Sequence, residues 1–287
     1  MSQSKYRFVF IQPFAIDSES EFLTWTVEGE KEQLLMNYEN LGLGRYLEGV
    51  DWDFHPGPRA PYGDWPVENR EEFALVAAAR LAIVKEACES GRYNGIMLLG
   101  GGEPGALEAR EIGKRYNIPV TSCATAQFQV ASMVGQKFSI IDLAESHAMY
   151  YRNLVTQAGM ENRFASMRLI PYPLGRPGYD DQADSLPVHK ARALRGEDSS
   201  AVKAAVDAAE AAILEDGAQV ITFGCSGTFW LQPFVKAGLL ERGWDVPVLE
   251  GYSAAFTQLK LLVDLGLDAS SLMFPADRPM RSRDKIL

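Results

Sequence analysis

The chain has 287 residues, of which 47% are apolar and 23% are charged, and its formal net charge at pH 7 is −10. This length predicts two domains of ordinary size, and the composition excludes a disordered or fibrous chain. A surface this acidic repels phosphate backbones and anionic lipid headgroups, which argues against nucleic acid or a membrane as the main partner.

Three cysteines, Cys88, Cys123 and Cys225, lie far apart and share no metal-ligand spacing with the three histidines. We therefore expect neither a disulfide framework nor a metal site. The first apolar stretch, from Phe8 to Ile11, is too short for a signal-peptide core or a membrane span, so a reducing cytoplasm is the expected location. Nothing resembles a dinucleotide fingerprint or a phosphate-binding loop, and we expect no cofactor.

Short β-branched or aromatic runs alternate along the chain with helical stretches rich in Ala, Leu, Lys and Glu. This alternation predicts an α/β protein whose parallel sheets are covered by helices on both faces. The expected strands are 7–14, 52–55, 95–99, 119–122, 138–143, 167–170, 219–223, 247–249 and 272–274. The expected helices include 71–90, 201–216 and 254–265.

A weak internal repeat is visible in the order strand, glycine-rich turn, helix, strand, helix. The strand at 95–99 ends in Gly100-Gly101-Gly102, and the strand at 219–223 ends in Gly224-Cys225-Ser226-Gly227. The repeat predicts two similar flavodoxin-like domains related by a pseudo-twofold axis. Ligands of open α/β sheets bind beyond the carboxyl ends of the strands, so we expect the active-site cleft between these two ends.

The predicted domain boundary falls between the two copies of the repeat. We expect an N-terminal domain at 1–132 and a C-terminal domain at 133–253, with a last helix at about 254–287 that can pack back onto the first domain. A small molecule held between two such domains is the expected partner.

Cys225 is the expected catalytic residue. A thiol between a strand and a helix start lies beside unpaired backbone N–H groups and the positive end of the helix dipole, which lowers its pKa. Such a cysteine can exchange a proton at a carbon acid or attack a carbonyl group. The alternative is a small buried residue that fills the turn.

Backbone amides are the expected oxyanion donors. The amides of Gly100, Gly101 and Gly102 can cradle a carboxylate or enolate oxygen, unless this run is simply a tight strand-to-helix turn. On the second side the corresponding donors are expected at Ser226, Gly227 and Thr228.

Two further positions are candidates for substrate contact. Cys123 follows a strand and can reach the same cleft, although a buried structural cysteine is the favoured interpretation. Asp142 is either a ligand contact at a strand end or the N-cap of a helix that begins near Ser146. His147 is interpreted as a helix-start residue.

Two motifs resemble those of the aspartate/glutamate/hydantoin racemase superfamily. The run from Leu99 to Gly105, followed by Ala109-Arg110-Glu111, is similar to the hydantoin racemase signature in which an alanine and a catalytic cysteine precede F-G-D-P-G and A-R-E. The run from Phe223 to Gly227 is similar to the second signature, L-G-C-A-G. The resemblance implies a cofactor-independent isomerase that forms a homo-oligomer.

The chain also departs from that pattern. The first catalytic cysteine of the family is replaced by Gly100, or by Gly101 if the internal repeat sets the alignment. The substrate-binding N-P-N run of the family is Gln12-Pro13-Phe14 here, which makes Gln12 a substrate-binding candidate, and Asp142 stands where a threonine is expected. One cysteine facing a glycine resembles the arylmalonate decarboxylases of the same superfamily.

The leading hypothesis is therefore a racemase-like enzyme with one catalytic cysteine, acting on a small carboxylate or a cyclic amide such as a hydantoin derivative. A single-cysteine decarboxylase, another lyase or a hydrolase of the same superfamily is the first alternative. The second alternative is a catalytically silent protein that binds a small molecule in the same cleft.

Overall fold

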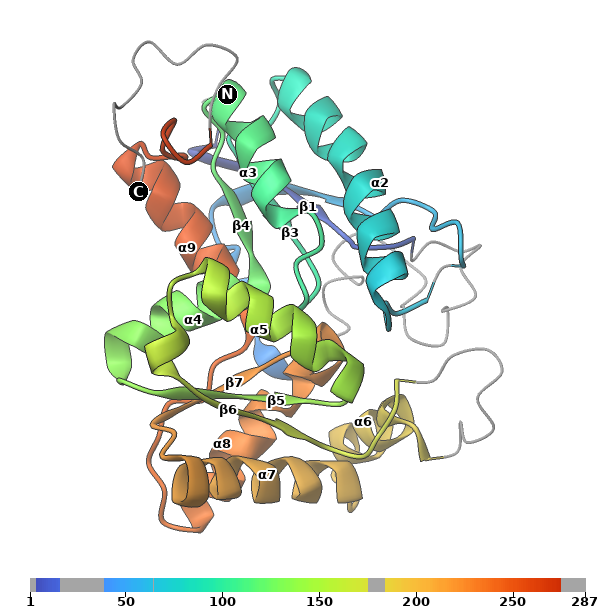
Figure 1. Ribbon diagram of the computed structural model, residues 1–287, viewed down its shortest axis with the longest axis vertical. Helices are drawn as coiled ribbons and strands as arrows, with labels where there is room; N and C mark the ends of the chain where they lie inside the picture. Colours follow the sequence, from blue (N-terminus) through green and yellow to red (C-terminus); the bar gives the residue numbers. More distant parts are fainter. Residues whose placement is uncertain (1–3, 16–38, 64, 175–183, 275–287) are drawn as a thin grey trace.

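The computed structural model describes residues 4–15, 39–63, 65–174 and 184–274 (Figure 1). Within these residues, parallel strands form two separate sheets. The strands are β1 (Tyr6–Ile11), β2 (Val50–His55), β3 (Gly95–Leu98), β4 (Val120–Ser122), β5 (Phe138–Asp142), β6 (Phe164–Leu169) and β7 (Val220–Phe223). The helices are α2 (Arg70–Glu89), α3 (Ala106–Arg115), α4 (Cys123–Val134), α5 (Ala148–Gln157), α6 (Leu186–Leu194), α7 (Ser200–Asp216), α8 (Gln232–Glu241) and α9 (Gly251–Leu265).

The strand order is β2-β1-β3-β4 in the first sheet and β6-β5-β7 in the second. All pairings within these sheets are parallel, as the strand and helix alternation predicts. Val248 adds an isolated parallel bridge to Ile221 at the free edge of β7. The predicted α/β class with two parallel-sheet domains is confirmed.

Alternating side chains of β1 enter two different cores. Val9 and Ile11 pack with residues of α2 and α3, whereas Phe8 and Phe10 pack with residues of α9. Successive side chains of a strand point to opposite faces, so helices cover both faces of the first sheet. This burial on both faces explains why the strands read as continuous apolar runs.

The hydrogen-bond register defines how the two halves correspond. Leu98 pairs with Ile11 in the first sheet, and Phe223 pairs with Ile141 in the second. The residue after Leu98 and the residue after Phe223 each donate their N–H to the neighbouring strand: Leu99 donates to the Ile11 carbonyl, and Gly224 donates to the Ile141 carbonyl. Gly100 and Cys225, the residues that directly follow these two donors, therefore occupy equivalent positions in the pseudo-twofold relation.

The two halves exchange a helix. Although α4 follows β4 of the first sheet, it contacts β5 and β7 of the second; α9 follows the bridge at Val248 but contacts β3 and β4 of the first. In Figure 1, α9 lies alongside β4 and α4 lies between the two sheets. The helices also contact each other, and their first residues, Cys123 and Gly251, lie so close that a Cβ atom on Gly251 would be 2.6 Å from the Cys123 Cβ.

Two expected strands differ from the structure. Residues 272–274 form a turn, in which Met273 and Phe274 both donate their N–H groups to the Ser270 carbonyl. The expected strand at 247–249 is reduced to the bridge at Val248. Both runs are apolar, but three residues are too few to indicate on their own whether a partner strand lies within reach. The domain boundary near residue 132 stays a prediction, and 275–287 lie outside the described residues.

Candidate active site

The carboxyl ends of the two sheets meet at their glycine-rich turns. A Cβ atom on Gly101 would overlap the Gly224 carbonyl oxygen and would lie 2.7 Å from the Tyr151 hydroxyl oxygen. A Cβ atom on Gly224 would lie 2.5 Å from a carboxylate oxygen of Asp142. Glycine is therefore required at both positions: at Gly101 because the backbone of the other half packs against it, and at Gly224 because the buried Asp142 side chain does.

Cys225 lies half-buried at the end of β7, immediately before a 3-10 helix at Ser226–Leu231. The Gly227 N–H points to its sulfur and stabilises a thiolate, as expected for a helix start. Burial and the Asp142 carboxylate act in the opposite direction and outweigh it, so the pKa of Cys225 is raised. The expectation of a lowered pKa is wrong in this structure, and Cys225 is a protonated thiol at neutral pH.

Asp142 is completely buried at the end of β5. One carboxylate oxygen accepts hydrogen bonds from the N–H groups of Leu143 at 2.7 Å and Cys225 at 3.2 Å. The other lies 3.1 Å from Nδ1 of His147, whose Nε2 lies 3.1 Å from the Val67 carbonyl oxygen. Asp142 is not an N-cap, because the short helix beside it starts after Ala144 without a side-chain cap.

Thr228 closes the turn that follows Cys225. Its N–H and its hydroxyl both donate to the Cys225 carbonyl oxygen, at 2.8 Å and 2.6 Å. A Cβ atom on Gly227 would overlap a methyl group of Leu174. These contacts fix the turn from Cys225 through Ser226 to Thr228, while its role in binding a substrate stays a prediction.

Cys123 is the first residue of α4, directly after β4 of the first half. Its side chain is fully buried, and its thiol donates a hydrogen bond to the Leu98 carbonyl at 3.7 Å. Burial raises its pKa well above the ordinary value, although the Gly100 N–H points to the sulfur and opposes that shift. This environment is that of the buried structural cysteine, and substrate contact by Cys123 stays a prediction.

The remaining sequence-predicted residues lie at or near the same strand ends. Gln12, half-buried after β1, corresponds in register to Asp142, the last residue of β5, and donates its N–H to the His55 carbonyl. Gly100 has a φ of 97°, in the left-handed region, and a Cβ atom there would be 3.1 Å from Pro13 Cγ. Gly102 lies against Phe73 at an ordinary contact distance. Substrate binding by these groups stays a prediction.

Arg80 is a site-supporting residue that the sequence analysis missed. Its completely buried guanidinium donates to the carbonyl oxygens of Ile11 at 2.6 Å, Leu99 at 2.9 Å and Pro104 at 3.3 Å. Burial lowers its pKa to about 9. One arginine thus ties the carboxyl ends of β1 and β3 to the glycine-rich turn. An arginine at a helical position gave no sequence signal for this, since charged residues on helices usually face solvent.

Two more side chains hold the site together: Glu103, which is hydrogen-bonded to α4, and Gln127, which lies on α4. The Glu103 carboxylate accepts hydrogen bonds from the N–H and the hydroxyl of Thr125, both at 2.7 Å, and so caps the start of α4. Gln127 donates to the Phe223 carbonyl and accepts from the Phe223 N–H, both at 2.9 Å. These contacts join the glycine-rich turn of the first half to the last residue of β7 in the second.

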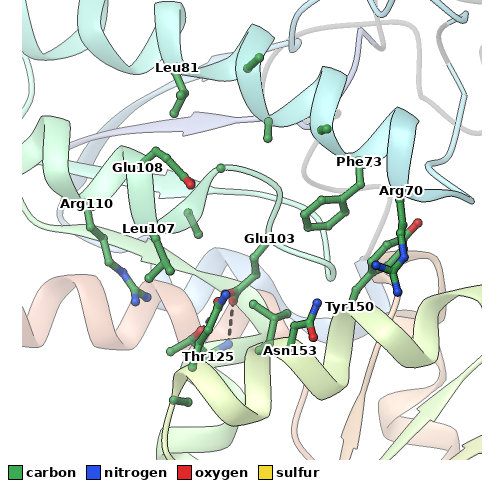
Figure 2. Close-up of a pocket in the computed structure, with 18 of the residues that line it drawn as sticks. Arg70, Phe73, Leu81, Glu103, Leu107, Glu108, Arg110, Thr125, Tyr150 and Asn153 are labelled. Atoms are coloured by element: carbon green, nitrogen blue, oxygen red, sulfur yellow. Dashed lines mark hydrogen bonds between the residues drawn. The ribbon is translucent and has the colours of Figure 1, made fainter.

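A cavity of about 490 Å³ lies next to Glu103, between helices of the two halves. Figure 2 shows α2 and α3 on one side, α5 on the other, and the Glu103–Thr125 hydrogen bond at its base. The stacked rings of Phe73 and Tyr150 lie 4.6 Å apart at one end. Cys225 is not among the residues that line this cavity.

In the part of the chain that the structure describes, no cluster of side chains is arranged to hold a metal ion. The same part contains no helix that is long and apolar enough to span a membrane.

Comparisons with known proteins find relatives named as hydantoin racemases. Hydantoin racemase of Paenarthrobacter aurescens is 30% identical over 169 residues, 59% of this chain and 61% of that protein. Hydantoin racemase of a Pseudomonas species is 29% identical over 171 residues, 60% of this chain and 59% of that protein. The matched segment thus spans less than two thirds of the length of these relatives.

Solved structures share the fold over nearly the whole chain. Allantoin racemase from Klebsiella pneumoniae superposes with a TM-score of 0.66 at 23% identity and covers 97% of each chain. Arylmalonate decarboxylase superposes with a TM-score of 0.52 at 14% identity, over 90% of this chain and 92% of that one. A family model described as Asp/Glu/hydantoin racemase matches residues 66–259. The chain belongs to the Asp/Glu/hydantoin racemase family.

Proposed function

We propose that this chain is a cofactor-independent enzyme of the racemase type that moves a proton at the carbon next to a carbonyl group. Cys225 is the catalytic residue in this proposal, and the substrate is a small carboxylate or a cyclic amide such as a hydantoin derivative. The observation that carries the proposal is the pseudo-twofold register, in which the turn with Cys225 corresponds to the turn with Gly100.

The chemistry follows from the protonation state of the thiol. A planar enolate between the two turns is stabilised when backbone N–H groups bind its oxygen. The thiol of Cys225 donates its proton to the enolate carbon from one side; the S–H bond breaks as the new C–H bond forms, and the thiolate recovers its proton from solvent. In the reverse direction the thiolate removes that proton. Gly100 offers no proton on the opposite side, so loss of chirality requires that a water molecule protonates the enolate carbon there.

The cyclic amide is the favoured substrate class, because hydantoin racemases match in sequence. Decarboxylation of a substituted malonate is a second candidate reaction. Its support is the single thiol opposite glycine, since loss of carbon dioxide generates the enolate without a base and leaves only one protonation to perform. Cytoplasmic location and a homo-oligomeric state belong to the same proposal, and the homo-oligomeric state rests on the family resemblance.

Solvent deuterium incorporation tests the proposal. The protein is incubated in deuterated buffer with allantoin, a 5-substituted hydantoin and a substituted malonate, and products are followed by proton NMR and chiral chromatography. Exchange of the ring C–H proton with loss of chirality indicates an isomerase on a cyclic amide. Release of carbon dioxide with one labelled enantiomer indicates the decarboxylase.

A matched pair of cysteine variants locates the chemistry. Cys225→Ser is expected to lower the rate by at least about a hundredfold, in line with the loss of a general acid. Cys88→Ala should retain it, because Cys88 is buried in α2, where burial raises its pKa to about 11. Unchanged exchange in Cys225→Ser, or no reaction with any of the three compounds, would contradict the proposal and favour the binding-protein alternative.

A further inference from the structure

Asp142 has its carboxylate oxygens engaged inside the protein. Oδ1 accepts the N–H groups of Leu143 and Cys225, and Oδ2 faces the His147 ring, while the side chain is fully shielded from solvent. A carboxylate held in this way is not placed to receive a substrate. It is placed to hold the backbone of Cys225 and to act on the thiol through its charge.

His147 is held between two acceptors. Nδ1 faces the Asp142 carboxylate and Nε2 faces the Val67 carbonyl, each at 3.1 Å. A neutral imidazole has one N–H group and satisfies one of them, whereas the imidazolium satisfies both. Burial alone lowers the pKa of His147, but the charge of Asp142 and the two hydrogen bonds outweigh it, and the pKa is raised above 6.5.

Among the described residues, the other titratable groups that interact with Cys225, Asp142 or His147 do not supply a compensating charge. Tyr151 of α5 interacts with both Cys225 and Asp142, and burial raises its pKa well above 10, so its hydroxyl stays neutral. Glu68 interacts with His147 and, like Asp142, favours the imidazolium. The charge close to the Cys225 thiol is therefore that of Asp142, balanced from its far side by His147.

We propose that Asp142 and His147 form a charge-balanced pair of positioning residues, in which Asp142 holds the turn at Cys225 and His147 limits how strongly that carboxylate opposes thiolate formation. The inference rests on the proposed role of Cys225 as the proton carrier. It assigns Asp142 to the support of the thiol instead of to the substrate.

Two substitutions separate the charges. In Asp142→Asn the shape is kept and the negative charge is lost, so the thiolate becomes easier to form; labelling of Cys225 by N-ethylmaleimide at pH 7 should be about tenfold faster or more. In His147→Gln the carboxylate loses its counter-charge, so labelling should be about threefold slower or more. Rates are read at Cys225 by peptide mass spectrometry.

The control removes a different ion-paired carboxylate, at the last residue of α7. Asp216 precedes the start of β7, at the end opposite to Cys225, and pairs with Arg168 at 2.7 Å. Asp216→Asn should leave the labelling rate of Cys225 unchanged. Cys88, raised in pKa by burial, is an internal control within every sample.

The pH profile adds a signature that loss of packing would not give. As the pH rises through the raised pKa of His147, the imidazolium is lost and Asp142 opposes the thiolate more strongly. The labelling rate of the wild-type protein should therefore rise less than tenfold per pH unit across that range, and the full slope should return in His147→Gln.

Opposite shifts in the two variants support the pair. Shifts in the same direction, or no shift in either variant, would overturn it. Because the readout needs no substrate, the proposed function can fail in the deuterium experiment while the pair is upheld, and the pair can fail while Cys225 still catalyses proton exchange.

Discussion

Single glycines control how closely the two halves approach each other. A Cβ atom on Gly101 would overlap a backbone carbonyl and crowd the Tyr151 hydroxyl, whereas a Cβ atom on Gly102 would be 3.4 Å from Phe73, at an ordinary contact distance. Backbone cannot give way as the end of a flexible side chain can. The two adjacent glycines should therefore respond differently to the same substitution.

Gly101→Ala is expected to lower the free energy of unfolding by about 3 kcal/mol, because the added methyl group forces the two turns apart. Gly102→Ala should change it by less than about 1 kcal/mol. Urea denaturation followed by circular dichroism measures both values. Equal stability of the two variants would show that the contact between Gly101 and Gly224 is not tight in solution.

At the residue scale the sequence located the turns but not their electrostatics. The strand ends and the glycine runs follow from local pattern, and so does the helix start after Cys225. The pKa of Cys225 is raised by burial and by the charge of Asp142, 83 residues away in the chain, and both depend on how the elements pack. Arg80 and Gln127 escaped notice for the same reason, since their partners lie on other elements.

Among the elements, α4 makes the most informative contacts, because it joins the two sheets. The side chain of Gln127, on this helix, makes two hydrogen bonds to the backbone of Phe223 at the end of β7. Exposed Gln129 lies two residues further along the same helix. The sequence correctly predicted most strands and the long helices, but periodicity within one helix does not say which sheet that helix covers.

Gln127→Ala should lower the free energy of unfolding by roughly 2 to 4 kcal/mol, because it leaves the N–H and the carbonyl of Phe223 buried without these partners. Gln129→Ala should stay within about 0.5 kcal/mol of the wild-type protein. Guanidinium titrations of the two variants give the comparison. A small effect of Gln127→Ala would indicate that water satisfies the freed groups.

Across the whole molecule the exchange of α4 and α9 couples the two halves. Each helix leaves its own half and covers strands of the other sheet, so neither sheet has a complete core without the opposite half. The alternation of strands and helices predicted the two sheets. The exchange was anticipated only for the last helix, because the repeat gives the order of elements and not their partners in space.

This coupling predicts a single cooperative unfolding transition for the full chain in calorimetry, with equal calorimetric and van't Hoff enthalpies. The isolated segment 1–132 should not fold, because α4 would expose its apolar face and β3 and β4 would lose α9. Two separable transitions, or a folded segment with a native-like circular dichroism spectrum, would contradict the coupling.

The left-handed backbone of Gly100 also limits which mutations could add a thiol to the site. One base change converts a glycine codon to a cysteine codon, so a second thiol looks simple to acquire. At a φ of 97°, however, a cysteine is strained, and its Cβ would press on Pro13. The turn has a shape that only glycine accepts readily, so a working pair of thiols is out of reach of that mutation alone.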